Sequence, residues 1–122
     1  MATGIIPKNA VLVWENPSPT SDFAAQQVSV DLSKYDAVYI GYKSRKGADA
    51  IVAIDFIFVG TQLYTSYLNY SSTNLCYYTR AATPNSDKVT FNNCNLYTQG
   101  SAGTATQKND YLIPKYIYGM KF

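Results

Sequence analysis

Short apolar stretches recur along the chain with turn-forming residues between them, and this pattern predicts a protein made of β-strands. In residues 27–32 apolar and polar side chains alternate, which is typical of a strand with one buried face. Residues 16–20 and 83–87 are rich in proline, asparagine and serine, which favour turns. No amphipathic helical pattern continues for more than a turn or two. Strands are expected over residues 11–14, 27–32, 37–42, 51–59, 63–70, 75–81, 88–91 and 110–118.

About eight short strands with turns between them favour an all-β fold. We expect a single β-sandwich of antiparallel strands, jelly-roll-like in its connections. The chain has 122 residues, which suits one domain with a substantial core. Because no repeat or linker divides it, residues 11–122 are expected to form the sandwich and residues 1–10 an N-terminal arm. Residues 99–106, which are rich in glycine, alanine and threonine, are expected to form a loop.

Two segments depart from simple alternation. Residues 51–59 are apolar on both faces, which predicts a central strand covered on both sides or a strand buried in an assembly. The last strand contains Pro114, which has no N–H and should lie at a sheet edge or a bulge. Gly119 is expected to mark the place where this strand turns away from the sheet. The strand is apolar enough that we expect it to be clamped against the core.

Composition narrows the possible partners. Apolar residues make up 47% and charged residues 15%, with a net charge of +2. The one basic cluster, residues 43–46, is typical of a solvated turn, so no nucleic-acid surface is expected. No segment approaches the roughly 20 apolar residues of a membrane span. The N-terminus has no charged start followed by an apolar core, so we expect no signal peptide.

The residue inventory argues against catalysis. The chain has no histidine, which excludes Ser-His-Asp and Cys-His arrangements, and its two cysteines cannot supply the four ligands of a structural zinc site. It also lacks a glycine-rich phosphate loop. We expect no enzyme, no metal and no cofactor. Cys76 and Cys94 each lie nine residues from Asn85, so a symmetric hairpin would place them opposite each other, but a chain that is not secreted favours free thiols.

Three polar or aromatic positions inside the apolar pattern, together with Asp31, are candidate structural residues. Asp55 lies in the most apolar strand and is the candidate for a raised pKa. Arg80 could contact an anion or a sugar, or it could hold a carboxylate and loop carbonyls between the sheets, with Asp31, Asp36 and Asp55 as candidate partners. The structural interpretation is favoured for Arg80. It is also favoured for Trp14, as a core or inter-strand anchor rather than a ligand contact.

Tyrosine is the strongest functional signal, with twelve copies in the chain. The side chain offers a flat apolar face and a hydroxyl group, which suits sugar stacking and protein interfaces, although tyrosine also favours ordinary half-buried strands. A spacing of three puts consecutive tyrosines on alternating faces unless a bulge intervenes. The candidate ligand-binding residues are Tyr64, Tyr67, Tyr70, Tyr77 and Tyr78.

Several motifs together resemble a small β-sandwich module of phage and prophage tail, fibre and minor structural proteins. The resemblance covers nearly the whole chain from Val11 onward, and it depends on the order and spacing of motifs that are individually weak. The motifs are Trp14-Glu-Asn-Pro17 followed by Phe23, Val28-Ser-Val-Asp-Leu-Ser-Lys-Tyr-Asp36, Arg80 followed by Val89-Thr-Phe91, and Leu112-Ile-Pro-Lys-Tyr-Ile-Tyr-Gly119.

The resemblance implies a bacteriophage virion protein, made in the bacterial cytoplasm and serving as a fibre, head-decoration or tail component. Its expected partners are further copies of itself, in a trimer, and other virion proteins, with a contribution to host-surface attachment. A carbohydrate-binding module that recognises a host glycan is the alternative. A small phage-encoded protein that interferes with the host is a more remote one. Neither nucleic-acid binding nor membrane insertion is expected.

Overall fold

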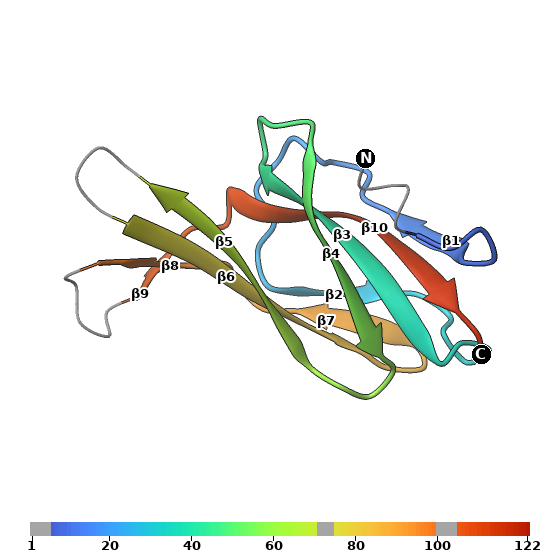
Figure 1. Ribbon diagram of the computed structural model, residues 1–122. Coiled ribbons are helices and arrows are strands. Elements are labelled where there is room, and N and C mark those ends of the chain that lie inside the picture. The colour runs from blue at the N-terminus through green and yellow to red at the C-terminus, as the bar shows by residue number, and fades with distance from the viewer. Residues whose placement is uncertain (1–5, 71–74, 100–104) are drawn as a thin grey trace.

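The computed structural model describes residues 6–70, 75–99 and 105–122, apart from the side chain of Tyr70. Every regular element among these residues is a strand, and the strands form two antiparallel sheets that pack as a β-sandwich (Figure 1). The all-β sandwich predicted from the sequence is therefore confirmed, with ten described strands instead of about eight.

The first sheet has four strands in the order β1-β10-β3-β4. β10 lies between the N-terminal strand and β3, so the two ends of the chain are joined in one sheet. The strands are β1 (Val11–Glu15), β3 (Ala37–Arg45), β4 (Ile51–Phe58) and β10 (Tyr111–Met120).

The second sheet has six strands in the order β2-β7-β6-β8-β9, and β5 pairs with the other edge of β6. β7 and β8 pair with successive parts of the same β6 edge. The strands are β2 (Gln26–Ser29), β5 (Leu63–Tyr70), β6 (Leu75–Pro84), β7 (Lys88–Phe91), β8 (Asn95–Thr98) and β9 (Ala105–Gln107).

The strands β8 and β9 were not predicted from the sequence. Asn95–Thr98 is half-buried throughout and the three residues of β9 are all exposed, so neither strand has a marked apolar alternation. β9 also begins inside the expected loop at residues 99–106, of which residues 100–104 lie outside the described part of the chain. Pairing of β8 with β6, and of β9 with β8, makes these residues strands, rather than a local pattern.

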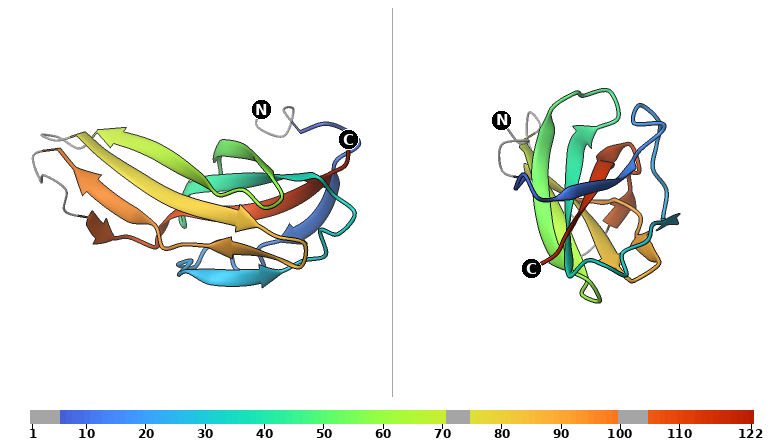
Figure 2. Two further views of the ribbon diagram at one scale, coloured as in Figure 1. Left: turned by 90° about the horizontal axis from the view of Figure 1, so that it is seen from below. Right: turned by 90° about the vertical axis from the view of Figure 1, so that its right-hand side faces the viewer.

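The second sheet is longer than the first. The far halves of β5 and β6, together with β8 and β9, extend beyond the first sheet as a flat projection (Figure 2). We call this projection the arm. The core therefore lies only where the two sheets overlap, and the arm has a face that no other sheet covers.

The core contains the inward-facing residues of both sheets. β10 supplies Ile113 and Ile117, and β3 supplies Ile40, all fully buried. From the second sheet, Val89 and Phe91 of β7 pack against them. This alternation of buried and outward residues is what a half-covered sheet requires.

β4 is the main departure from the predicted arrangement of strands. The expectation of a central strand covered on both sides is wrong, because β4 pairs only with β3 and forms an edge of the first sheet. After Phe58 the chain turns at Gly60, whose φ of 94° suits glycine, and enters the second sheet. Nothing in the described chain pairs with the other edge of β4, so this edge stays open, and the outward side chains of Val52, Phe56 and Phe58 are exposed.

The C-terminal strand lies inside the sheet, between β1 and β3. Pro114 is next to a register shift between β10 and β3, a placement at which a missing N–H is tolerated. The strand does not turn away at Gly119, contrary to the expectation, and its pairing continues to Met120. Glycine is needed there for another reason, because a Cβ atom would come within 2.7 Å of the Tyr35 ring.

Deleting the chain from Ile113 onward should abolish the fold. The deletion removes Ile113 and Ile117, each contributing roughly 1.5–3 kcal/mol by burial, and it also separates β1 from β3. The combined loss is comparable with a whole stability of about 5–15 kcal/mol. Circular dichroism should show no cooperative melt. A matched deletion of the exposed residues Lys121 and Phe122 should keep one, and a cooperative melt of the longer deletion would contradict the role given to β10.

Candidate functional site

The outer face of the first sheet carries a row of apolar side chains across all four strands. Leu12 is paired with Tyr118, Tyr118 with Tyr39, and Tyr39 with Phe56, so the four side chains share one face. The rings of Tyr39 and Phe56 have centroids 5.0 Å apart. None of these four side chains is charged, and we call this row with the neighbouring Phe58 and Phe122 the aromatic face.

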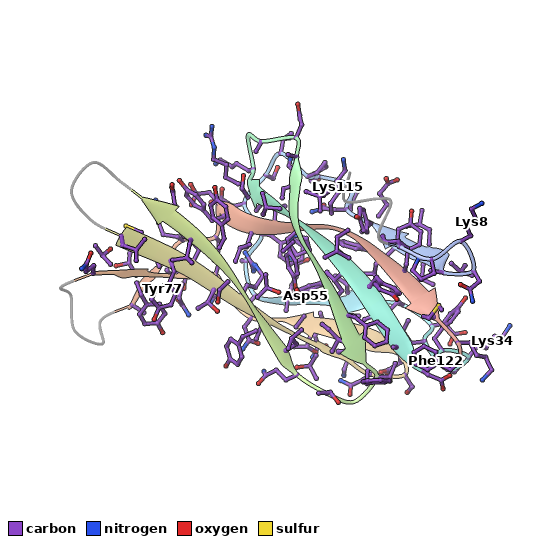
Figure 3. The ribbon with its side chains drawn as sticks, viewed as in Figure 1. Lys8, Lys34, Asp55, Tyr77, Lys115 and Phe122 are labelled. Atoms are coloured by element: carbon purple, nitrogen blue, oxygen red, sulfur yellow. The ribbon has the colours of Figure 1, made fainter. Side chains whose placement is uncertain are left out.

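The aromatic face is open to solvent where it reaches β4. Phe58 and Phe122 are 53% and 68% exposed, and their ring centroids lie 6.0 Å apart. Figure 3 shows Phe122 beside the end of β4. Large aromatic side chains exposed in a group are typical of interaction surfaces rather than of an ordinary solvated face.

The edge of β4 adds unpaired main-chain groups to this surface. The N–H of Val59 donates to the carbonyl of Asp36. The main-chain N–H and C=O groups of the alternate residues Ile57 and Asp55 therefore also point toward β3. Ile54 and Phe56 consequently direct their N–H and C=O groups away from the sheet. An apolar edge strand of eight residues is a ready template for pairing with another chain.

Asp55 is the one charged side chain of β4, and it points inward between the sheets (Figure 3). Burial raises its pKa to about 6. Its Oδ2 atom has no hydrogen-bond partner among the described residues, and the same holds for the hydroxyl oxygens of Tyr42 and Thr65. Desolvation therefore opposes the charged form of this carboxylate, and no cation compensates it.

Arg80 is fully buried and holds main-chain carbonyls, not a carboxylate. Its guanidinium donates to the carbonyl oxygens of Leu112 (2.9 Å), Asn92 (2.7 Å) and Tyr111 (3.2 Å), and it lies 5.3 Å from the centroid of the Phe23 ring. Leu112 has a φ of 49°, a conformation that costs a leucine energy. Arg80 therefore links β6 to the start of β10.

The three carboxylates expected beside Arg80 have other surroundings. The carboxylate of Asp31 accepts from the N–H and hydroxyl of Ser33 at an exposed turn, which lowers its pKa. Asp36 accepts from the N–H of Phe122. The sequence could not predict the carbonyl partners of Arg80, because every residue has a carbonyl and only the fold decides which ones converge.

The tyrosines of β5 and β6 divide between the two faces of the second sheet. No register shift interrupts the pairing of β5 with β6, so Tyr64 and Tyr77 face outward while Tyr67 and Tyr78 face inward. The inward Tyr78 stacks on Tyr111 with centroids 3.9 Å apart. Burial raises the pKa of Tyr78. Tyr70 shares the outward parity by its register, but its side chain lies outside the described residues.

The outward face of the arm carries a stacked pair that was not predicted from the sequence. Tyr77, labelled in Figure 3, lies nearly parallel to Tyr97 of β8, with centroids 5.0 Å apart and an interplanar angle of 14°. Tyr77 is 42% exposed, and its neighbour Leu68 is 64% exposed. Tyr97 was overlooked because β8 was not recognised as a strand.

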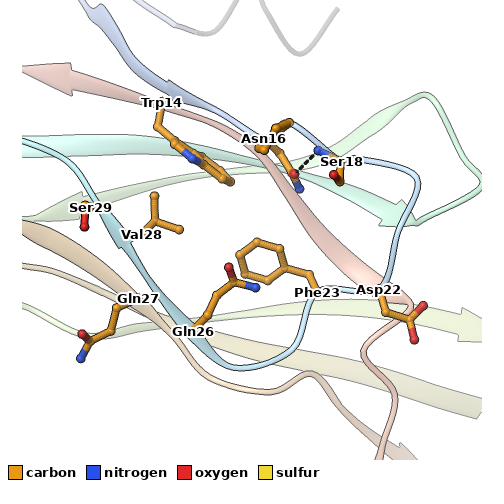
Figure 4. Close-up of a pocket in the computed structure, with 10 residues that line it drawn as sticks. Trp14, Asn16, Ser18, Asp22, Phe23, Gln26, Gln27, Val28 and Ser29 are labelled. Atoms are coloured by element: carbon orange, nitrogen blue, oxygen red, sulfur yellow. Dashed lines mark hydrogen bonds between the residues drawn. The ribbon is translucent and has the colours of Figure 1, made fainter.

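Trp14 lies at an opening between the two sheets. Its ring packs on Phe23 and Phe91, with centroids 6.3 and 6.4 Å away, so it anchors the core. It also lines a cavity of about 340 Å³ between the end of β1 and the edge of β2 (Figure 4). The same residue thus has a packed side and a side that faces a cavity.

Both cysteines are free thiols, as predicted, but they are not opposite each other. Cys76 pairs with Thr98, mainly because the hairpin pairs Pro84 with Val89 and so is not centred on Asn85; the break between β7 and β8 shifts the register by one more residue. Cys94 is buried, and burial raises its pKa to about 11. Among the described residues, no group of three or more acidic, cysteine or histidine side chains could hold a metal ion.

Comparison of the chain with protein-family models gives no match, and comparisons with curated proteins and with solved structures give no significant match. Within the described parts of the chain, no helix has the length and apolar character needed to cross a membrane.

Replacing Asp55 by asparagine should stabilise the protein above pH 6 and change little near pH 4. The folded pKa of about 6 lies above the ordinary value of 3.8, so the folded state binds this proton more tightly than the unfolded state. The charged Asp55 carboxylate lowers the stability of the wild type by its full amount above pH 6, and this destabilisation disappears as the pH falls below 3.8. With an allowance for partial exposure we expect a gain of about 1–2 kcal/mol at pH 8. Urea melts at pH 4 and pH 8 measure this gain in stability. Equal gains at the two pH values would contradict the raised pKa of Asp55.

Proposed function

We propose that the protein is a structural component of a bacteriophage virion, acting as a fibre, head-decoration or tail protein that assembles with copies of itself. The observation that supports this most is the aromatic face, where uncharged apolar side chains cross four strands and end at an unpaired strand edge. The motifs resembling phage modules give the setting, which is a particle assembled in the bacterial cytoplasm. Contacts with other virion proteins and a contribution to host attachment belong to the same proposal.

The aromatic face suits a second copy of the chain. Because its row carries no charge, two copies can approach without repulsion and without a complementary charged partner. Burying exposed rings such as Phe58 and Phe122 would supply the apolar centre that stable interfaces have. We propose a trimer with this face toward the axis, since a closed ring of three copies covers the face and the β4 edge together.

Glycan recognition is the second candidate function, and the stacked tyrosines of the arm favour it. Tyr77 and Tyr97 present a flat, partly exposed surface with hydroxyl groups at its rim. Such a surface stacks on the apolar face of a sugar ring while the hydroxyl groups form hydrogen bonds. In this case the arm would contact a host glycan while the aromatic face holds the particle together.

The variant Phe58→Lys should dissociate the oligomer. Phe58 is 53% exposed, so the lysine costs the folded monomer little, whereas in an interface it would place an unpaired charge among aromatic rings. Size-exclusion chromatography with light scattering should show a wild-type trimer and a monomeric variant at micromolar concentration. Tyr64→Lys is the matched control and should remain a trimer, because Tyr64 is 61% exposed and faces outward from the second sheet, not from the first. A wild-type monomer, or an interface below about 1,000 Å², would refute the assembly.

The variant Tyr77→Ala tests the glycan function separately. Loss of one stacking ring should weaken binding to an array of bacterial surface glycans by roughly two- to tenfold. Tyr64→Ala removes an exposed tyrosine outside the stacked pair and should bind like the wild type. If the wild type binds no glycan, or if both variants lose binding equally, the stacked pair is not a sugar platform.

A further inference from the structure

We propose that the cavity beside Trp14 binds an extended peptide segment of a partner protein, which adds as a strand to the free edge of β2 and inserts a large apolar side chain. This inference goes beyond the proposed assembly, because it concerns the opening between the two sheets and not the aromatic face. Four observations support it: which atoms of β2 line the cavity, what forms its floor, which polar groups remain available and where the nearby charges lie.

The wall of the cavity is the edge of a strand. The consecutive residues 26–29 all line it, although successive side chains of a strand point to opposite faces. A cavity can contact residues of both faces only at the edge of the strand, where the main chain is exposed. β2 is the terminal strand of its sheet, and its other edge pairs with β7.

The hydrogen-bond pattern shows which main-chain groups face the cavity. The N–H of Val30 donates to the carbonyl of Asp87 on the β7 side. The main-chain N–H and C=O groups of Val28, two residues earlier, therefore also point toward β7. Gln27 and Ser29 have the opposite parity and direct their N–H and C=O groups away from β7. These two residues offer the alternating donors and acceptors that an added strand requires.

The floor of the cavity is apolar. Val28 and Phe23 are 7% and 4% exposed, and half-buried Trp14 lies beside them. Figure 4 shows these three side chains pointing toward one space. A volume of about 340 Å³ is at the lower end for ligand pockets and suits one large apolar side chain with its main chain.

Three of the polar side chains around the cavity are already engaged. Asn16 donates to the carbonyl of Pro114 and accepts from the N–H of Ser18 (Figure 4). Gln26 donates to the carbonyl of Ala24, and Asp22 pairs with Lys46 at 2.8 Å. A sugar would need such side chains to orient it, whereas a peptide strand needs the main-chain groups that are still available.

Charge near one end of β2 indicates one more feature of the peptide. A neighbouring cavity of about 390 Å³ shares Ser29 and is lined by the carboxylates of Asp31 and Asp87. No ion pair engages either carboxylate among the described residues. The partner segment should therefore carry a basic residue next to its apolar side chain.

The test uses a blocked five-residue peptide of sequence Thr-Val-Phe-Thr-Lys as the probe. Titration followed by calorimetry and amide NMR should show binding by the wild type, with the largest shifts at the N–H groups of Gln27 and Ser29. The variant Gln27→Pro removes one outward N–H that the β2–β7 ladder does not use, so the fold should survive. We expect this variant to bind at least tenfold more weakly, while the matched control Gln27→Ala, which keeps the N–H, should bind within twofold of the wild type.

A second probe keeps the test decisive if the proline variant does not fold. N-methylation of alternate residues of the same peptide removes the N–H donors of one strand edge only, because successive N–H groups point to opposite edges, and it leaves the side chains unchanged. The register that methylates the edge facing β2 should bind more weakly to the wild type than the parent peptide does, whereas the other register should bind like the parent. Equal binding by Gln27→Pro and the wild type, or equal binding of the two N-methylated peptides, would overturn the proposal. It would also be overturned if the parent peptide did not bind at millimolar concentration, or if N-acetylglucosamine alone shifted these amides.

Discussion

The buried guanidinium of Arg80 is the interaction on which the junction of the two sheets depends. It gathers three main-chain carbonyls, from the break between β7 and β8 and from the start of β10, and hydrogen bonds from a charged donor contribute roughly 1.5–3 kcal/mol each. One acceptor belongs to Leu112, whose positive φ is unfavourable for leucine. The same contacts thus stabilise both the strained backbone at the start of β10 and the buried charge.

Because β10 lies between β1 and β3, the first sheet is continuous. One of its two faces packs on the second sheet and the other faces outward. Its inner side is filled by residues such as Ile40 and Ile117, and its outer side carries the aromatic face. An apolar face that ends in a free edge would promote uncontrolled pairing of chains. Asp55 points inward from this edge strand, and inward-pointing charge on an edge is one means by which proteins limit such pairing. The edge therefore combines an exposed apolar face with an inward charge that opposes uncontrolled pairing.

The candidate site could be predicted in part. Alternation of side chains along a strand placed Tyr64 and Tyr67 on different faces, and the regular register of β5 and β6 gives that arrangement. The stacking of Tyr77 on Tyr97 could not be predicted, because it joins residues of two strands whose pairing has no local signal. The cavity beside Trp14 was equally hidden, since it forms where edges of different sheets approach each other.

The sequence by itself determined that the chain is all-β, where most strands begin and that residues 51–59 are apolar on both sides, because these properties depend on local alternation and turn residues. Only the tertiary structure decided that β4 is an edge strand, that Arg80 binds carbonyls instead of Asp31, Asp36 or Asp55, and that Gly119 makes room for the Tyr35 ring. The physical reason is that strand order and burial depend on contacts between residues far apart in the chain. A local pattern indicates that an apolar face must be covered, but it does not indicate which surface covers it.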